Sequence, residues 1–443
     1  MNSARSWLVW AVGTLAYVVA ILHRSSLGVA GPAAAERFDI AATLLATLGA
    51  VQVGVYAAMQ VPVGVLLDRF GPRLLIASGA AVMLVGQVLV AVATELPVAI
   101  VGRVLLGIGD AATFISVIRL AAGWFRGPIL AQMSQWTGMA GQFGQLLSAV
   151  PFVWLLNQVG WTLSYATLAA VGAVILVLVL ILLRDAPPGG TPPTGSIDVP
   201  QGWWPRLQSA FRQPGTRLGF WTHFTLLAST NTFLLLWGFP MLVEGLGYSQ
   251  GEAAGLMSIV VVTGMVAGPI VGIATARFPL RRSTLVLSIT AILTTAWSVT
   301  LLWPTHPPTW MIVLLLIVVG IAGPGSTVGF DFARTSNPLR VLGSANGIVN
   351  VGGFIAAFMI MPAVGIALDL VHSARVAAGE SVGLYDWQGF RIALASQLVV
   401  FVLGFCMILR MRRLIRARMR EEEGVEVAPL WRAVAQWMKD RGR

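Results

Sequence analysis

The chain has 443 residues, of which 57% are hydrophobic and only 11% are charged, and its mean hydropathy is +0.81. Soluble domains carry about a quarter charged residues, so this composition excludes an ordinary soluble protein. The net charge of +11 would suit a nucleic-acid partner, but the basic residues gather in alternate short loops and after the last apolar run. That distribution is typical of a membrane protein, and no nucleic-acid partner is expected.

Apolar runs of about 20 residues recur along the whole chain, and each is long enough to cross a bilayer as a helix. The runs are continuously apolar rather than alternating, which favours helices over a barrel. The sequence therefore predicts an all-α membrane protein with twelve spans in two six-helix bundles. The spans lie roughly at 7–31, 42–67, 74–93, 97–122, 130–156, 161–183, 217–243, 253–276, 283–303, 310–333, 342–371 and 388–410.

The longest polar interval is rich in proline and glycine and reads as a cytoplasmic linker with a short interfacial segment. A strongly basic tail follows the last span, and we expect its arginines to lie along anionic lipid headgroups of the bilayer. The predicted parts are a bundle at 1–183, a linker at 184–216, a bundle at 217–411 and a tail at 412–443.

One loop occurs twice. The stretch Gly64-Val-Leu-Leu-Asp68-Arg69-Phe-Gly71-Pro-Arg73 joins the second and third spans. A degenerate copy, Gly272-Ile-Ala-Thr-Ala276-Arg277-Phe-Pro-Leu-Arg281, stands at the matching place in the second half, with Ala276 in place of Asp68. Two related loops at equivalent positions indicate a chain built by duplication.

Arginine counting predicts the orientation. Thirteen arginines lie in loops on the side of the N-terminus, whereas the opposite loops hold only Arg37, Arg375 and Arg391. Positive loops stay in the cytoplasm, so both termini are expected there. A single lysine, Lys439, against 28 arginines is typical of a GC-rich bacterial genome, and a bacterial inner membrane is therefore the expected location. The expected state is a monomer.

Charge inside the membrane is the main functional signal, because it costs at least about 2.5–3.5 kcal/mol at the centre of a bilayer. On the fourth span, Arg103, Gly107 and Asp110 share one helical face. Two readings are open. Asp110 pairs with Arg103 or Arg24 and only holds helices together, or it carries a proton that it takes up and releases as a nearby arginine moves.

Arg24 on the first span is the candidate ligand for an anion. Three embedded arginines face one central acid, and a bound carboxylate would offset the excess through a two-pronged guanidinium contact. The alternative is that Arg24 pairs only with Asp110 or with a helix carbonyl. Its neighbour His23 either titrates near neutral pH or simply hydrogen-bonds a neighbouring group.

Neutral polar residues on other spans are usually contacts between helices. Gln52, Tyr56 and Gln60 form a polar stripe at i, i+4 and i+8 on the second span. Some of the polar residues are expected to line a central substrate cavity. The candidates are Tyr56, Gln142, Asn231 and Asn350.

No enzyme is expected, because the chain has no phosphate-binding P-loop and no HExxH, CxxC or GxSxG motif. Four scattered histidines make a metal site improbable, and no cofactor is expected. Two rival functions were weighed. A drug/proton antiporter would favour an acidic, aromatic cavity, which the positive core opposes; a non-transporting sensor would need an appended soluble domain, and the tail after the last span is short.

The loop from Gly64 to Arg73 resembles the signature of the major facilitator superfamily, and Arg103-xxx-Gly107 is similar to its second signature. This resemblance implies two bundles that give alternating access. Three stretches are similar to the anion:cation symporter branch, which includes sialin and bacterial sugar-acid transporters, although nitrate-type and peptide porters share parts of the pattern. They begin at Arg24, at Arg103 and at Gly343.

The resemblance to that branch implies roles for individual residues. Arg24 would contact the carboxylate of the substrate, Asp110 would take part in proton coupling with Arg103 tuning it, and Asn350 would be a substrate contact. His23 stands where the branch often has an acid, which leaves the coupling ion open. The expected function is proton-coupled import of a small organic anion.

The resemblance also implies a conformational latch. Asp68 would lie near the N-terminus of the eleventh span, around residues 342–344, where free backbone N–H groups favour a negative charge. Arg69 and Arg73 would add contacts, with Asp331 as a partner. The latch would hold the outward-open state, and Ala276 would leave the copy at Arg277 without it.

Overall fold

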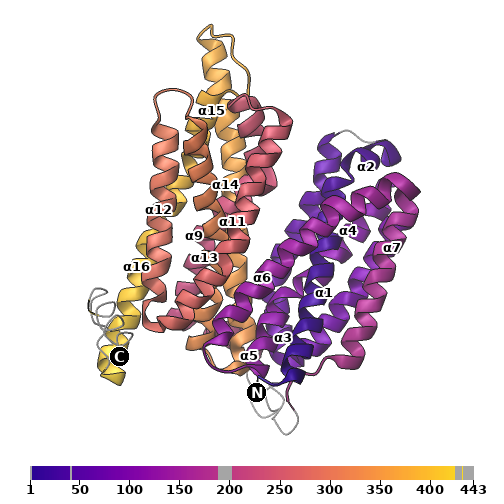
Figure 1. Ribbon diagram of the computed structural model, residues 1–443, viewed down its shortest axis with the longest axis vertical. Helices are drawn as coiled ribbons and strands as arrows, with labels where there is room; N and C mark the ends of the chain where they lie inside the picture. The colour runs from indigo at the N-terminus through magenta and orange to yellow at the C-terminus, as the bar shows by residue number, and fades with distance from the viewer. Residues whose placement is uncertain (1, 40–41, 188–201, 425–431, 433–443) are drawn as a thin grey trace.

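A computed structural model describes residues 2–39, 42–187, 202–424 and 432 (Figure 1). Regular structure in these residues is entirely helical. Within these described ranges, ten helices are long and apolar enough to cross a membrane. One of them, Gly54–Val92, contains two crossings because the chain kinks at Gly71, and the glutamine- and glycine-rich helix α6 adds another. The predicted all-α fold with twelve spans in two bundles is confirmed.

The first bundle contains six crossings. Two long helices contain two segments each, with a glycine of positive φ at the joint: Gly71 at +80° in α3 and Gly160 at +73° in α7. The fourth crossing is broken between α4 and α5, and the fifth contains the π-helical segment η1 (Ser148–Phe152). The helices are α1 (Ala4–Val29), α2 (Gly31–Phe38), α3 (Ala42–Val92), α4 (Leu96–Ala111), α5 (Phe114–Trp124), α6 (Ile129–Leu147) and α7 (Val153–Leu182).

The second bundle follows the short amphipathic helix α8 (Trp203–Arg212), which lies within the predicted linker. Part of that linker, 188–201, is outside the described residues, and α16 runs on into the predicted tail. The seventh crossing is α9 (Pro214–Thr232) with η2 (Phe233–Trp237), α10 (Gly238–Pro240) and η3 (Met241–Gly245). The others are α11 (Gln250–Arg277), α12 (Arg282–Leu302), α13 (Thr309–Ser336), α14 (Leu342–Ala377), and α15 (Trp387–Leu394) with α16 (Ser396–Glu423); the short turns η4 (Pro279–Arg281) and η5 (Leu339–Val341) precede α12 and α14.

The helix starts follow local chemistry. Ser3 caps α1 and Ser249 caps α11, each through a reciprocal capping box with the residue three positions later. Pro214 opens α9 at a position where its missing N–H is not needed. These signals fix where the crossings begin, while close packing and hydrogen bonds between helices hold each bundle together.

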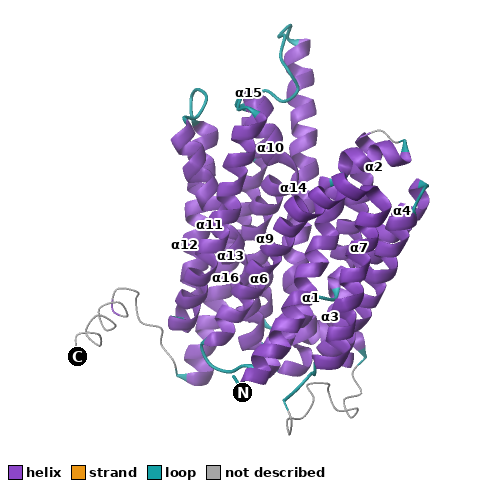
Figure 2. Ribbon diagram, turned by 45° about the vertical axis from the view of Figure 1, so that its right-hand side comes forward, coloured by secondary structure: helices purple, strands orange, loops and turns teal. Residues whose placement is uncertain are grey.

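The two bundles meet at one side of the molecule and diverge at the other (Figures 1 and 2). We call the side where α1 begins and α16 ends the terminal side. There α3 packs on α14, and α6 packs on α11 and α13. Buried apolar side chains of both bundles form one cluster at this contact, where the ring of Phe114 meets that of Phe330 edge to face, with ring centroids 5.3 Å apart.

Glycines allow the backbones of α3 and α14 to touch. A Cβ atom added at Gly64 would lie 2.7 Å from the carbonyl oxygen of Gly343, and one added at Gly347 would lie 2.5 Å from the carbonyl oxygen of Gln60. Neither contact can yield, because the opposing atoms belong to backbone. Any larger residue at these positions would therefore push the bundles apart.

Candidate functional site

The fourth crossing places its acid at a break in the helix. Asp110 occupies the last turn of α4, and the chain turns at Ala112 and Thr113 before α5 begins. The hydroxyl of Thr113 donates to the backbone carbonyl of Asp110 at 2.8 Å, and its N–H donates to the same carbonyl at 3.0 Å. The break is thus held by local hydrogen bonds, and the Asp110 carboxylate projects from a fixed point.

Arg24 of α1 makes a bidentate contact with this carboxylate through its guanidinium group. Its Nε donates to Oδ2 of Asp110 at 2.5 Å, and its Nη2 donates to Oδ1 at 2.8 Å. The Asp110 side chain is 1% exposed, whereas that of Arg24 is 23% exposed. The arginine therefore lies between the buried acid and more open space, and of the two predicted pairings the structure shows Arg24 with Asp110.

The same guanidinium reaches the second bundle through an aromatic ring. Its Cζ lies 4.2 Å from the centre of the Tyr56 ring on α3. The hydroxyl of Tyr56 accepts a hydrogen bond from Nδ2 of Asn350 on α14 at 3.2 Å, and the same amide donates to Oε1 of Gln60 at 2.6 Å. A continuous set of contacts therefore joins Asp110, through Arg24 and Tyr56, to α14 of the other bundle.

Arg103 and His23 belong to a separate buried group. Nη1 of Arg103 donates to Oε1 of Gln52 at 2.8 Å and to the backbone carbonyl of His23 at 3.4 Å. The His23 ring instead meets α7, where its Nε2 lies 3.1 Å from the carbonyl of Leu168. The shared helical face of Arg103 and Asp110 does not produce an ion pair between them, because each guanidinium and carboxylate finds a nearer partner on α1 or α3.

The remaining predicted substrate contacts are not joined to this group by hydrogen bonds. Gln142 on α6 is partly buried, and its Oε1 has no hydrogen-bond partner among the described residues. Asn231 on α9 is also partly buried. The sequence-based selection left out Gln60, although the polar stripe on the second span contained the signal.

The predicted latch residue Asp68 is fully buried at the terminal side. Its Oδ1 accepts from the backbone N–H of Gly343 at 2.6 Å, and its Oδ2 accepts from the N–H and the hydroxyl of Ser344 at 2.8 and 2.6 Å. These N–H groups open α14, so the carboxylate lies at the positive end of the helix. Arg119 of α5 is close enough to attract Asp68.

Arg69 and Arg73 do not make the contacts that were predicted for them. The Arg73 side chain donates to the carbonyl of Leu180 at 2.8 Å within its own bundle, and Asp331 pairs with Arg334, one turn away on α13, at 2.7 Å. The predicted contact of Arg69 or Arg73 with Asp331 is therefore wrong, because Arg73 is bonded within its own bundle and Arg69 is exposed. Only Oδ1 of Asp331 has a partner among the described residues. Arg69 is exposed, with its Cζ 5.1 Å from the centre of the Phe70 ring.

An acid that the sequence reasoning did not single out orders this loop. Asp185, just after α7, accepts the backbone N–H of Arg73 at 2.7 Å, and a Cβ atom on Gly71 would lie 3.0 Å from its carboxylate. Burial raises the pKa of Asp185, while its contacts with Arg73 work in the opposite direction. In the copy of the loop in the second half, Arg277 is the last residue of α11 and is exposed.

Comparison with known proteins agrees with this architecture. The family model described as Major Facilitator Superfamily matches residues 13–362. FucP, a transporter of that superfamily solved in the outward conformation, matches with a TM-score of 0.70 at 13% identity, covering 93% of this chain and 99% of that one. A bacterial homologue of the iron transporter ferroportin, in an outward-facing state, matches with a TM-score of 0.72 at 12% identity, covering 91% of this chain and 99% of its own.

Curated relatives include proteins named as probable transporters of sulfoacetate and of galactarate/D-glucarate. The probable sulfoacetate transporter SauU of Cupriavidus necator is 27% identical over 41% of this chain and 42% of its own, so that match spans less than half of the relative. The probable galactarate/D-glucarate transporter GarP of Escherichia coli K12 is 22% identical over 80% of this chain and 86% of its own. With a family match over most of its length and the corresponding fold, the chain belongs to the Major Facilitator Superfamily of membrane transporters.

Proposed function

We propose that this transporter imports a small organic anion together with a proton, by alternating access between its two bundles. The observation that carries the proposal is the two-pronged pair between Arg24 and Asp110, in which the acid is buried and the arginine is partly open. A carboxylate or sulfonate group of a substrate presents the same two oxygens to the guanidinium as Asp110 does.

Proton and substrate are linked because they compete over one arginine. When Asp110 is ionised, its two carboxylate oxygens accept both hydrogen bonds from the Arg24 guanidinium. Protonation removes the charge of Asp110, and Arg24 is then left in the core without a counter-charge, which favours binding of an anion. Binding of one proton and one anion thus restores the charge balance, whereas binding of either alone leaves it uneven.

The contacts from Arg24 through Tyr56 to Asn350 could couple binding at Arg24 to movement of the second bundle. Any shift of the Arg24 guanidinium changes its contact with the Tyr56 ring, and the Tyr56 hydroxyl is bonded to α14 of the other bundle. The Asp68 contact lies on the side where the bundles meet, and this supports our assignment of the arrangement to a state open on the opposite side. Rocking of the bundles would break the Asp68 contact and expose the site to the terminal side.

The orientation completes the proposal. The arginine-rich loops lie on the terminal side, and the positive-inside rule supports a cytoplasmic position for that side in a bacterial inner membrane. The state open on the opposite side is then open to the outside. Loading there and release at the terminal side would move the anion inward, with the protein working as a monomer.

The relatives suggest which anions to test, because their names give sulfoacetate, galactarate, D-glucarate and L-galactonate. Purified protein in liposomes would be given a pH gradient, alkaline inside, and each labelled anion in turn. We expect at least one anion to accumulate above its outside concentration, and a protonophore to abolish this. Accumulation that is indifferent to the protonophore would refute proton coupling, and no uptake of any anion would refute the substrate class.

A further inference from the structure

A cavity on the terminal side of the second bundle is distinct from the Arg24 site. It has a volume of about 320 Å³ and lies between α9, α12, α13 and α16. Three arginines line it: Arg282 at the start of α12, and Arg412 with Arg416 one turn apart on α16. None of the described residues that line it is acidic.

The positive charge around this cavity is only partly balanced. Arg282 is 9% exposed, and its Nε donates to the carbonyl of Thr275 at 3.4 Å. Asp331 is near enough to attract Arg282, but its Oδ1 already accepts from Arg334. Arg412 and Arg416 are close enough to repel each other. Guanidinium groups gathered in this way favour a bound anion.

The other lining groups fit a phosphate attached to an apolar body. Hydroxyl groups come from Ser283 and Ser336, whereas the hydroxyl of Thr335 already donates to the carbonyl of Asp331 at 2.9 Å. The first turn of α12 offers backbone N–H groups at the positive end of the helix. Leu280 and Ile415 supply apolar surface beside the charges. Basic pockets between membrane helices on the cytoplasmic side are suited to anionic lipid headgroups.

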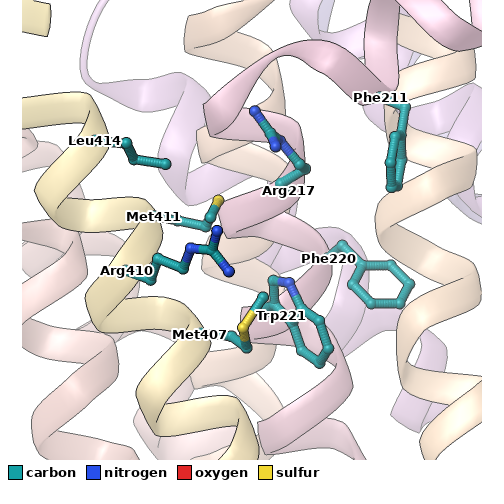
Figure 3. A pocket seen from close by; sticks show the side chains of 8 residues that line it. All are labelled: Phe211, Arg217, Phe220, Trp221, Met407, Arg410, Met411 and Leu414. Carbon is teal, nitrogen blue, oxygen red and sulfur yellow. The ribbon is translucent and has the colours of Figure 1, made fainter.

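A second cavity, on another face of α16, has a more apolar lining. It measures about 310 Å³ and is formed mainly by apolar side chains of α8, α9 and α16, with Arg217 and Arg410 as its charged residues (Figure 3). Arg410 reaches from α16 toward Trp221 of α9. No hydroxyl-bearing side chain lines this cavity in the part of the chain that the structure describes, and its two guanidinium groups stand in a mainly apolar lining.

We propose that the cavity lined by Arg282, Arg412 and Arg416 is a phosphate-binding site. Its phosphate comes from an anionic phospholipid headgroup or from a soluble phosphate. The apolar lining leads us to expect the lipid, with its headgroup among the arginines and its glycerol and acyl part against Leu280 and Ile415.

The experiment compares two double variants with equal loss of charge on one helix. Arg412→Gln/Arg416→Gln removes arginines that line the cavity, whereas Arg413→Gln/Arg418→Gln removes exposed ones that do not. Full-length protein is stripped of lipid in neutral detergent. It is then titrated with phosphatidylglycerol or with inorganic phosphate, and binding is followed by native mass spectrometry and thermal melting.

We expect the cavity pair to weaken phosphatidylglycerol binding by roughly tenfold or more, and the exposed pair to leave it within about twofold of wild type. If inorganic phosphate rather than lipid shows this pattern, the site stands and its phosphate is soluble. Equal losses in both pairs would overturn the proposal, because they would mean general attraction of lipid to a basic helix. Unchanged binding in the cavity pair would overturn it as well.

If the cavity pair fails to fold, Arg412→Lys/Arg416→Lys keeps the charge and removes only the planar two-pronged geometry. Arg282→Gln then tests the same cavity from α12. Each is expected to weaken phosphate binding relative to the exposed pair. Wild-type binding by both variants would overturn the proposal in this form of the test too.

Discussion

The two bundles contribute differently to the contacts between them. Along α3 and α14, the first bundle supplies Asp68 and the Arg24–Tyr56 contact, while the second supplies backbone N–H groups and the neutral amide of Asn350. Where α6 meets α13, the contact is neutral on both sides, with Gln135 donating to Oγ1 of Thr327 at 2.6 Å. The difference suggests that one bundle carries the titrating groups and the other responds through hydrogen bonds.

Removing Arg24 should have the largest effect. Arg24→Ala deletes the anion ligand and leaves Asp110 buried without its partner, a change that costs about 3–5 kcal/mol. We expect anion uptake into liposomes to fall by at least about 100-fold. Arg413→Ala, on the exposed face of α16, is the matched control and should transport normally.

The double variant Arg24→Ala/Asp110→Ala separates folding from binding. It removes both charges, so its thermal stability should recover relative to Arg24→Ala while uptake stays absent. Wild-type uptake by the single or the double variant would show that the charged pair does not bind the substrate.

Asp68→Asn should have the next largest effect. The amide has only one acceptor oxygen and turns an NH₂ toward the N–H donors of Gly343 and Ser344, so charge-assisted bonds are lost. We expect the population of the state closed on the terminal side to fall by on the order of tenfold or more.

The measurement for Asp68→Asn is the distance between spin labels on the opposite side. Labels at Glu95→Cys and Ser381→Cys, in a Cys406→Ser background, report on the divergence of the two bundles. The variant should shift the distribution toward shorter distances. An unchanged distribution would contradict the role of Asp68 as a latch.

Asn350→Ala tests the response of the second bundle. The substitution removes the donor shared by the Tyr56 hydroxyl and Gln60, and leaves both acceptors buried. We expect uptake at saturating anion to fall by about tenfold or more, since the loss of these two hydrogen bonds leaves buried acceptors unpaired, at a cost on the order of 1–3 kcal/mol. Asn231→Ala changes a residue without a hydrogen bond to this group, and it should reduce uptake less than Asn350→Ala does. A larger loss of uptake in Asn231→Ala would contradict the role of Asn350 in joining the two bundles.

Gln135→Ala should have the smallest effect, because it removes only neutral hydrogen bonds from α6 to Thr327 and to the carbonyl of Pro324. In the same spin-label assay we expect a population change of about threefold. A change in population as large as that of Asp68→Asn would contradict our expectation that the charged contact of Asp68 contributes more than the neutral contact of Gln135.

Much of the fold could be predicted from the sequence, because crossings of a membrane are long apolar runs and loop charges follow the positive-inside rule. The number of crossings and the two-bundle fold were predicted in this way. The joints at Gly71 and Gly160 lie between predicted spans, where the sequence places turns. The break before Phe114 lies inside the predicted span 97–122 and was not predicted, because it depends on packing between helices.

The candidate site could be predicted only in part. Arg24 and Asp110 stood out because charge is rare in apolar spans, but the sequence left two arginines as partners for the acid. Spacing along one helix suggested Arg103 as the partner, whereas in the structure Asp110 forms its ion pair with Arg24 on another helix. Asp331 was misassigned for the same reason: helical spacing and loop motifs do not reveal which charge is already satisfied by a neighbour.

The most direct test of the coupling is proton uptake on anion binding. A transported anion from the liposome screen is added to purified protein in weakly buffered detergent solution, and the pH change is recorded for wild type and Asp110→Asn. The account predicts uptake of about one proton per bound anion by wild type and none by Asp110→Asn. Proton uptake that persists in Asp110→Asn would contradict competition of proton and substrate over the Arg24–Asp110 pair.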